Sequence, residues 1–491
     1  MSIEEKKEPG LGSAAFGPLL AVFTVAIFLS AALLFVVQPM FTKMVLPQLG
    51  GSPAVWSVAI VFFQAVLLAG YAYAHLITRH APTRVSLIIH TAVMAAAALT
   101  LPIAIAAGWG RPPSEGEALW LIGLFAVSIG LPFFALAANA PLIQAWFARS
   151  RHPRAKDPYF LYAASNIGSM LALLSYPFVV EPMTRLPQQR VAWSMGFVGL
   201  IVLIGACGVL AWRAGGEARA ALVEEAAGAR PGWRDAAIWM ALAAIPSGLL
   251  IAVTAHLSTD IAPSPFLWVI PLALYLLSFV IVFQREPILP HNWMVWIQPL
   301  LLVGLVDTIV ETLNEKLPLL MLLNLVAFFV TAMVCHGELA RRRPAAGHLT
   351  AFYMWMSAGG VVGGISTALV APYIFSWVAE YPILIVLAIL CRPGLSFADR
   401  RQTALVAGGF AVAAAVIVVP AIWFGFTLDD QQFYWSLRIL LFVALAASLW
   451  SNPLPFAAVI VLAFMVWRFY EVDLNRVRSF LKAHLPTTAA R

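Results

Sequence analysis

Long runs of apolar residues, separated by short polar stretches, recur from one end of the chain to the other. A helix needs ~20 mainly apolar residues to cross a bilayer, and most of these runs reach that length. Proline, glycine and charged residues occupy the joints between the runs. The pattern predicts helices at 17–37, 57–78, 85–107, 118–148, 159–180, 190–212, 234–257, 265–283, 292–310, 317–340, 349–374, 378–391, 403–424, 432–450 and 455–470.

One pattern occurs twice, six predicted helices apart. A Ser-Pro-x-x-Trp motif opens the second run at 52–56 and the eighth at 264–268. Ser30 in the first run has a counterpart in Ser247 of the seventh. An even offset means that both copies enter the membrane in the same direction, which is typical of a parallel duplicated bundle. The sequence therefore predicts an all-α, polytopic membrane helix bundle with a six-plus-six pseudo-repeat of the major-facilitator kind.

The predicted helices and the charged joints divide the chain into five parts. These are a first six-helix half at 1–212, a charged linker at 213–234, a second half at 235–392, additional C-terminal membrane helices at 393–471 and a basic tail at 472–491. Together they would hold about 14 to 15 transmembrane helices. The linker is the longest polar interruption, and it is too short to fold as a soluble catalytic domain.

The composition agrees with a bilayer environment. The chain is 62% hydrophobic and 11% charged, with a mean hydropathy of +0.88, far from the balance of soluble domains. Its net charge of +7 resides largely in short loops beside helix ends, which is how membrane topology is encoded. We therefore expect no nucleic-acid partner, and the lipid bilayer is the expected environment.

Every second predicted loop is basic, which places these loops and the N-terminus in the cytoplasm. The basic loops carry Arg79 and Arg84, Arg149 to Lys156, Arg213 to Arg234, Arg341 to Arg343, and Arg392 to Arg401. The tail conflicts with this rule, because a crossing by every predicted helix would put Arg468 and Arg476 outside. Either the tail escapes the rule or one of the last two runs does not cross, and the side of the tail stays open.

No catalytic or metal signature is visible. The three cysteines show no paired spacing, and the histidines never gather with cysteines or carboxylates at metal-ligand spacing. Neither a nucleophile elbow nor an HExxH motif occurs. We expect no metal, no cofactor and no enzyme activity.

Polar groups within spans are the better candidates for function, because each is costly in lipid unless it has a partner. The predicted substrate-binding residues are Gln38, Asn139, Asn166, His256 and Asp260, which we expect to line a cavity between the halves. Two alternatives stay open. Asn139 and Asn166 are equally suited to hydrogen-bond neighbouring helices, and His256 and Asp260, four residues apart, suit either a proton relay or a capped helix end.

Charged residues at helix ends suggest gates. Glu338 is expected to pair with Arg341 or Arg342, as a gating salt bridge or as a plain anchor. The offset between Ser30 and Ser247 places Lys43 at the position equivalent to Asp260. Lys43 and Asp260 are therefore candidates for a latch at the outer face, and two unrelated interfacial charges are the alternative.

The predicted helix 349–374 contains glycines spaced four residues apart, at Gly359 with Gly363 and Gly360 with Gly364. Small residues at this spacing let two helix backbones approach closely. No strand precedes them, so they do not form a nucleotide-binding loop.

Several blocks resemble the membrane region of bacterial fused major-facilitator/spermidine-synthase proteins. They are Gln38-Pro39-Met40, Leu46 to Trp56, Asn139-Ala140-Pro141-Leu142, Asp157 to Asn166, Thr254 to Asp260, and Cys335-His336-Gly337-Glu338-Leu339-Ala340. The resemblance covers roughly residues 17–470. It implies a bacterial inner (cytoplasmic) membrane protein, and in that family a soluble aminopropyltransferase-like domain follows the membrane region.

This sequence departs from the family after Arg478-Ser479-Phe480, where only 481–491 remain and the glycine-rich cofactor loop is missing. Aminopropyl transfer is therefore not expected of this chain. Two functions stay open. The first is a transporter-like protein that moves or binds a small molecule between its halves. The second is a membrane anchor or subunit for a separately encoded aminopropyltransferase-like enzyme.

Overall fold

The computed structural model describes residues 16–48, 53–109, 113, 116–150, 152–213, 230–257, 269–284, 288–310, 317–375, 377–396, 430–449 and 451–468, with single positions between 401 and 412. Within these residues the chain is helical, as the hydropathy pattern predicts. In the described part of the chain, nine helices are long and apolar enough to cross a membrane, and five shorter helices are also apolar. The described part of the chain is therefore that of a multi-pass membrane protein.

The first half contains α1 (Phe16–Val45), α2 (Pro53–His80), α3 (Thr83–Ala98), α4 (Glu117–Phe125), α5 (Leu131–Ala148), α6 (Phe160–Ser175), α7 (Glu181–Met183) and α8 (Leu186–Arg213). A π-helical turn at Ala126–Gly130 joins α4 to α5. A second π-helical turn at Tyr176–Val180 joins α6 to α7. Each of these pairs is one continuous helix with a local widening.

The second half contains α10 (Trp233–His256), α11 (Val269–Val282), α12 (His291–Val310), α13 (Leu317–Arg341), α14 (Leu349–Ile365), α15 (Ala371–Ile374) and α16 (Glu380–Leu390). A π-helical turn at Ser366–Val370 joins α14 to α15. It lies at the same place in the fifth helix of this half as Tyr176–Val180 does in the first. Beyond this half come α18 (Asp430–Ala447) and a helix at Leu454–Arg468.

Helix packing repeats between the halves. In the first half α1 packs against α5, α6 and α8, and in the second α10 packs against α13, α14 and α16. Likewise α2 packs against α5, and α11 packs against α13. Each partner in one half is six helices away from its counterpart in the other, as the parallel repeat requires. The third helix departs from the rule, because α3 packs on α8 whereas α12 packs on α18.

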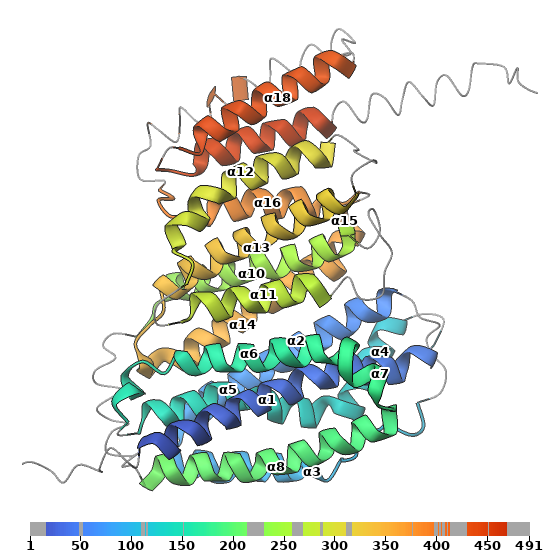
Figure 1. The fold of residues 1–491 in the computed structure, drawn as a ribbon, viewed down its shortest axis with the longest axis vertical. Helices are drawn as coiled ribbons and strands as arrows, with labels where there is room; N and C mark the ends of the chain where they lie inside the picture. Colours follow the sequence, from blue (N-terminus) through green and yellow to red (C-terminus); the bar gives the residue numbers. More distant parts are fainter. Residues whose placement is uncertain are drawn as a thin grey trace, which may run out of the picture.

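The two halves lie one above the other in Figure 1, with α2 and α6 of the first half next to α11 and α14 of the second. The side chain of Trp56 and the whole of Trp268 and Asp260 lie outside the described residues. The predicted superposition of the two tryptophans therefore stays a prediction.

Two predicted boundaries were wrong. The first helix does not end at residue 37 but continues through Pro39 to Val45, since a proline inside a helix removes one hydrogen bond without always ending the helix. The third helix ends at Ala98 instead of 107. Pro102 follows, and the residue before a proline disfavours helical geometry.

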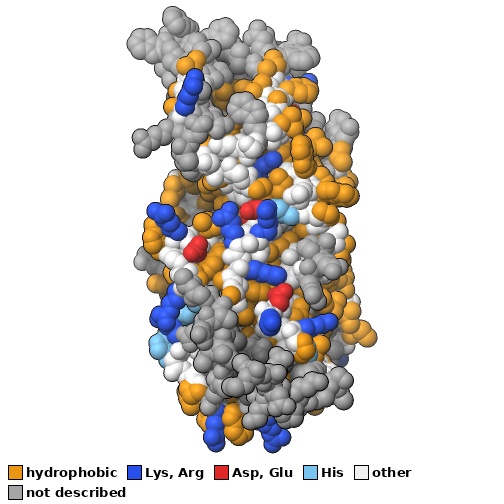
Figure 2. Space-filling model, turned by 90° about the vertical axis from the view of Figure 1, so that its left-hand side faces the viewer, with side chains coloured by type: hydrophobic (Ala, Val, Ile, Leu, Met, Phe, Trp, Pro, Cys, Tyr) orange, Lys and Arg blue, Asp and Glu red, His pale blue; other side chains and the backbone are white. Residues whose placement is uncertain are grey.

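Basic residues gather at one end of the bundle, where α2, α5, α8 and α13 finish. Arg79, Arg149, Arg213 and Arg341 lie at or directly after these helix ends. Figure 2 looks at this end and shows Lys and Arg side chains spread across it, with few Asp and Glu side chains among them. We call it the basic end. It is the end that the charge pattern assigns to the cytoplasm.

Candidate functional site: the junction between the halves

The junction is built on matching faces of α2 and α14, which run antiparallel. Residues at helical spacing on α2, namely Gln64, Leu67, Tyr71, His75 and Thr78, share one face. Near the basic end, His75 Nδ1 lies 3.0 Å from Thr350 Oγ1, and Thr78 Oγ1 donates to the same hydroxyl at 3.4 Å. Further in, the Tyr71 and Tyr353 ring centroids are 6.4 Å apart. Deeper still, Gln64 lies directly against Gly364.

Aromatic side chains from both halves close the junction on its basic side. We call this group the aromatic seal; its members are Tyr71, Tyr159 and Tyr162 of the first half and Phe279, Phe283, Phe352 and Tyr353 of the second. The rings of Tyr162 and Tyr353 are stacked with centroids 4.9 Å apart. Tyr162 also makes edge contacts with Phe279 at 5.6 Å and Phe283 at 5.1 Å. All seven are buried, so the seal leaves little room for water at this level.

Hydrogen bonds and an ion pair reinforce the seal. Tyr353 donates its hydroxyl to Gln144 Oε1 at 2.7 Å, and Tyr159 donates to the Pro344 carbonyl at 2.9 Å. Burial raises the pKa of Tyr159, which keeps the donated proton in place. Arg343 stands over the Tyr159 ring and approaches Asp157 at 3.4 Å. Each of these contacts joins one half to the other.

Polar groups occupy the middle of the junction, one turn beyond the stacked tyrosines. Asn166 lies on the same face of α6 as Tyr162 and Leu173, both of which pack against α11. Ser357 lies one turn after Tyr353 on α14, and its buried Oγ has no partner among the described residues. Gln64 Oε1 is also buried there without a described partner. Such groups normally have hydrogen bonds, so these are available to a ligand or to water.

Of the five predicted substrate-binding residues, Asp260 lies outside the described residues, and the other four do not gather at one place. Asn166 faces the junction, and its Nδ2 donates to the Tyr162 carbonyl at 2.9 Å. Asn139 lies away from the junction, inside the first half, so it follows the alternative in which it bonds to neighbouring helices. Gln38 bonds to Leu34 of its own helix at 3.2 Å, and His256 lies beside Tyr381 with ring centroids 5.6 Å apart.

The predicted gating residues have partners within one half. Glu338 accepts from His291 at 2.9 Å and lies 3.1 Å from Arg341 and 3.5 Å from Arg342. This arrangement anchors α13 to α12. Its role as a gate stays a prediction.

Lys43 pairs with Glu181 of the first half, and both side chains are partly exposed. Asp260 lies outside the described residues, so the latch between Lys43 and Asp260 also stays a prediction. The sequence did not predict Glu181 as the partner of Lys43.

The sequence did not predict the aromatic seal, nor Gln64 and Ser357 as part of the site. A signal existed on α2, where Gln64, Tyr71, His75 and Thr78 recur on one helical face within an otherwise apolar run. Polar or aromatic side chains repeated on one helical face indicate that this face packs against protein and not against lipid.

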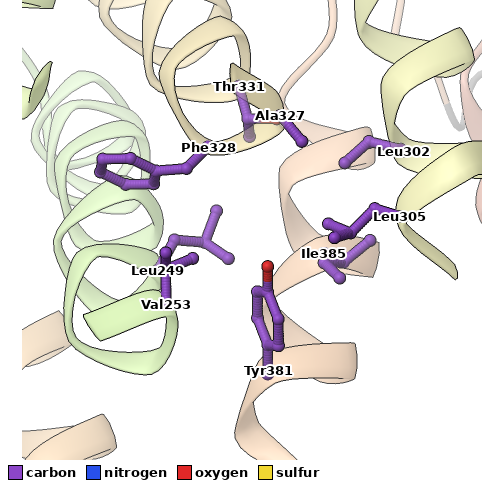
Figure 3. Close-up of a pocket in the computed structure, with 9 residues that line it drawn as sticks. All are labelled: Leu249, Val253, Leu302, Leu305, Ala327, Phe328, Thr331, Tyr381 and Ile385. Atoms are coloured by element: carbon purple, nitrogen blue, oxygen red, sulfur yellow. The ribbon is translucent and has the colours of Figure 1, made fainter. Parts of the chain in front are cut away.

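A small cavity lies apart from the junction, inside the second half. It is lined by Leu249, Val253, Leu302, Leu305, Ala327, Phe328, Thr331, Tyr381 and Ile385. Figure 3 shows the Tyr381 hydroxyl pointing into this space from α16. The lining is mostly apolar, and only Thr331 and Tyr381 contribute polar atoms from their side chains.

No protein-family model and no curated protein sequence matches this chain. Among solved structures, the human organic anion transporter MFSD10 (TETRAN) is 14% identical, with a TM-score of 0.48 over 75% of this chain and 98% of that chain. A double-tryptophan mutant of XylE is 13% identical, with a TM-score of 0.46 over 77% of this chain and 94% of its own. These comparisons give no support to the aminopropyltransferase-like partner that the resemblance implied. The six-plus-six arrangement rests on the helix packing described above.

Proposed function

We propose that this chain is a transporter that moves a small molecule between two six-helix halves, 1–212 and 235–392, joined by the linker 213–234. The junction carries this proposal. Its basic side is closed by contacts made between the halves, while buried polar groups in its middle lack partners among the described residues. Rocking of one half against the other would open the seal and expose these groups, which is how parallel-repeat transporters alternate access.

The side chains in the middle of the junction favour an uncharged, hydrogen-bonding substrate. Gln64, Asn166 and Ser357 offer amide and hydroxyl groups, which can both donate and accept hydrogen bonds. Gln38, His256 and Asp260 remain candidates for contact in another conformation. We assign the basic end to the cytoplasm of a bacterial inner membrane, because the positive-inside rule applies to short loops. The conformation described here is then closed toward the cytoplasm.

Cysteine labelling tests the closure. In a variant in which Cys207, Cys335 and Cys391 are replaced by alanine, Ser357→Cys places a thiol behind the seal. Tyr353→Ala should raise the rate at which a membrane-impermeant maleimide labels this thiol from the basic side by about tenfold. The reason is that a tenfold population shift needs only ~1.4 kcal/mol, and truncating a buried aromatic residue generally removes more than that.

The matched control is Phe197→Ala, because Phe197 is fully buried in the first half and stacks on Trp193 with centroids 5.4 Å apart. It should leave labelling from the basic side unchanged. Equal labelling in the two alanine variants would mean that the seal is only general core packing, and the gating role would be lost. If the labelling instead differs as expected, a comparison of metabolites in cells and medium, with and without the protein, would identify the substrate.

A charge exchange at the edge of the seal should behave differently. Asp157→Arg places two arginines together, because Arg343 is 3.4 Å away, and should raise the labelling rate about two- to fivefold, consistent with ~0.5–1 kcal/mol for an exposed pair. Arg343→Asp should act in the same direction. The double exchange restores opposite charges and should return the rate toward the parent value. A double variant no slower than either single variant would show that this ion pair does not hold the halves together.

A further inference from the structure

The first half contains a network of three buried polar side chains from three helices that bond directly to one another, while His90 Nδ1 has no partner among the described residues. His90 of α3 donates its Nε2 proton to Asn139 Oδ1 of α5 at 2.7 Å. Asn139 Nδ2 in turn donates to Ser30 Oγ of α1 at 3.0 Å. All three residues are at most 2% exposed. A direct bond between side chains thus joins α3 to α5 in the middle of this half.

The second half has polar residues at corresponding depths. Gln298 lies two turns into α12, as His90 lies two turns into α3. Thr331 lies about three turns before Arg341 at the end of α13, as Asn139 lies before Arg149 at the end of α5. Gln298 and Thr331 also face the same interface, because His291 contacts Glu338 at one end of the two helices and Leu302 meets Ala327 in the cavity lining further along.

In the second half, no hydrogen bond between the corresponding side chains is described. Gln298 is fully buried, yet neither its Nε2 nor its Oε1 has a partner among the described residues. Thr331 is 1% exposed, and its Oγ1 also lacks one. Ser247, the counterpart of Ser30, donates instead to the Gly360 carbonyl at 3.0 Å. Three buried polar atoms are thus left without a described hydrogen bond, each at a free-energy cost of ~1–3 kcal/mol if it stayed dry.

The cavity lies next to Thr331 and one helical turn from Gln298, which is not itself a lining residue. Thr331 lines it directly, and Leu302, one turn after Gln298, forms another part of its wall. On the opposite side, the Tyr381 hydroxyl points into the cavity (Figure 3) and donates to Asn324 Oδ1 at 2.8 Å, so its oxygen can still accept a bond. A buried water typically makes two to four hydrogen bonds, and this site offers that number of groups.

We propose that the second half holds a buried hydration site between α12, α13 and α16, bounded by Gln298, Thr331 and Tyr381. Ordered water at this site forms hydrogen bonds with these side chains, as Asn139 does with His90 and Ser30 in the first half. The third helix is then held differently in the two halves, by a direct bond between side chains in one and through water in the other. This site is separate from the junction and does not depend on the transport proposal.

Radiolytic labelling in water enriched in oxygen-18 tests the proposal on the intact protein. Hydroxyl radicals formed from a bound water modify the side chains beside it, so Phe328 and Tyr381 should gain oxygen-18 although they are only 3% exposed. Phe197 is the internal control. It is fully buried in the first half and stacks on Trp193 with centroids 5.4 Å apart, so it should stay unlabelled. Absence of label on Phe328 and Tyr381 would overturn the proposal.

Two substitutions at Thr331 sharpen the result. Thr331→Val keeps the shape of the side chain but removes the hydroxyl, so labelling of Phe328 and Tyr381 should fall at least fivefold. Thr331→Ser keeps the hydroxyl and should retain the label. Equal labelling in the valine and serine variants would overturn the assignment of Thr331 as a water ligand, and with it the site as proposed. The measurement on the unaltered protein stands even if the valine variant fails to fold.

Discussion

Gly359→Ala is expected to lower the thermal stability of the protein by several degrees. A Cβ atom at this position would overlap the Met240 carbonyl oxygen in the backbone of α10. A helix backbone cannot move aside as a flexible side chain can, and overpacking of this kind costs about 1–3 kcal/mol. The midpoint of thermal unfolding in detergent, followed by tryptophan fluorescence, would measure the effect.

Gly360→Ala is the matched control, one residue along the same helix. A Cβ atom there meets nothing within 4 Å, and alanine is favoured over glycine inside a helix by up to ~1 kcal/mol. Its midpoint should stay unchanged or rise. Gly363→Ala should behave like Gly359→Ala, because its Cβ would overlap the Ala244 carbonyl. Equal midpoints for Gly359→Ala and Gly360→Ala would contradict the close approach of α10 and α14.

Asn139→Ala should destabilise the first half by about 2–4 kcal/mol. The substitution leaves His90 and Ser30 buried, and His90 Nδ1 already has no partner among the described residues. Each buried polar group without a hydrogen bond costs ~1–3 kcal/mol. The unfolding midpoint in detergent would again report the loss.

Asn166→Ala provides the comparison, since both residues are buried asparagines in the interior of a helix. The amide of Asn166 donates to the carbonyl of Tyr162 on its own helix, so its removal leaves no other side chain stranded. The expected loss is below ~1 kcal/mol. A second comparison is the double variant His90→Leu with Asn139→Leu, which should recover part of the stability lost in Asn139→Leu alone. Equal losses in both asparagine variants would mean that the network with His90 contributes nothing.

The sequence predicted the helices well because their signal is local. An apolar run between polar joints predicts a membrane-spanning helix regardless of which other helices pack against it. The structure places most helices close to the predicted positions. The close approach expected from the glycines of 349–374 is confirmed for Gly359 and Gly363, which meet the backbone of α10, whereas Gly360 meets nothing within 4 Å and Gly364 meets the Gln64 side chain. Small residues at a fixed spacing carry this information within a single helix.

The site could not be derived in the same way, because it depends on which helices meet. Tyr162 and Tyr353 stack although roughly 190 residues separate them in the sequence. Neither helix by itself indicates that the two tyrosines are partners. Lys43 was assigned to the outer face from the repeat, whereas its partner Glu181 follows a π-helical turn that hydropathy does not reveal. Asn139 was one of several polar residues in spans, and only its distance to His90 identifies it as part of a network between helices.

The paired π-helical turns at Tyr176–Val180 and Ser366–Val370 have a consequence for the outer rim of the bundle. A π-turn holds about one residue more than an α-helical turn, so it rotates the following side chains by roughly 100° about the helix axis. Before the turns in the chain, Tyr162 and Tyr353 face the junction. Phe178, within the first turn, is 71% exposed, and Tyr373, just after the second, is 91% exposed. One inserted residue in each half therefore sets the direction in which its rim points. Deleting it from both halves would rotate α7 and α15 by the same angle about their helix axes.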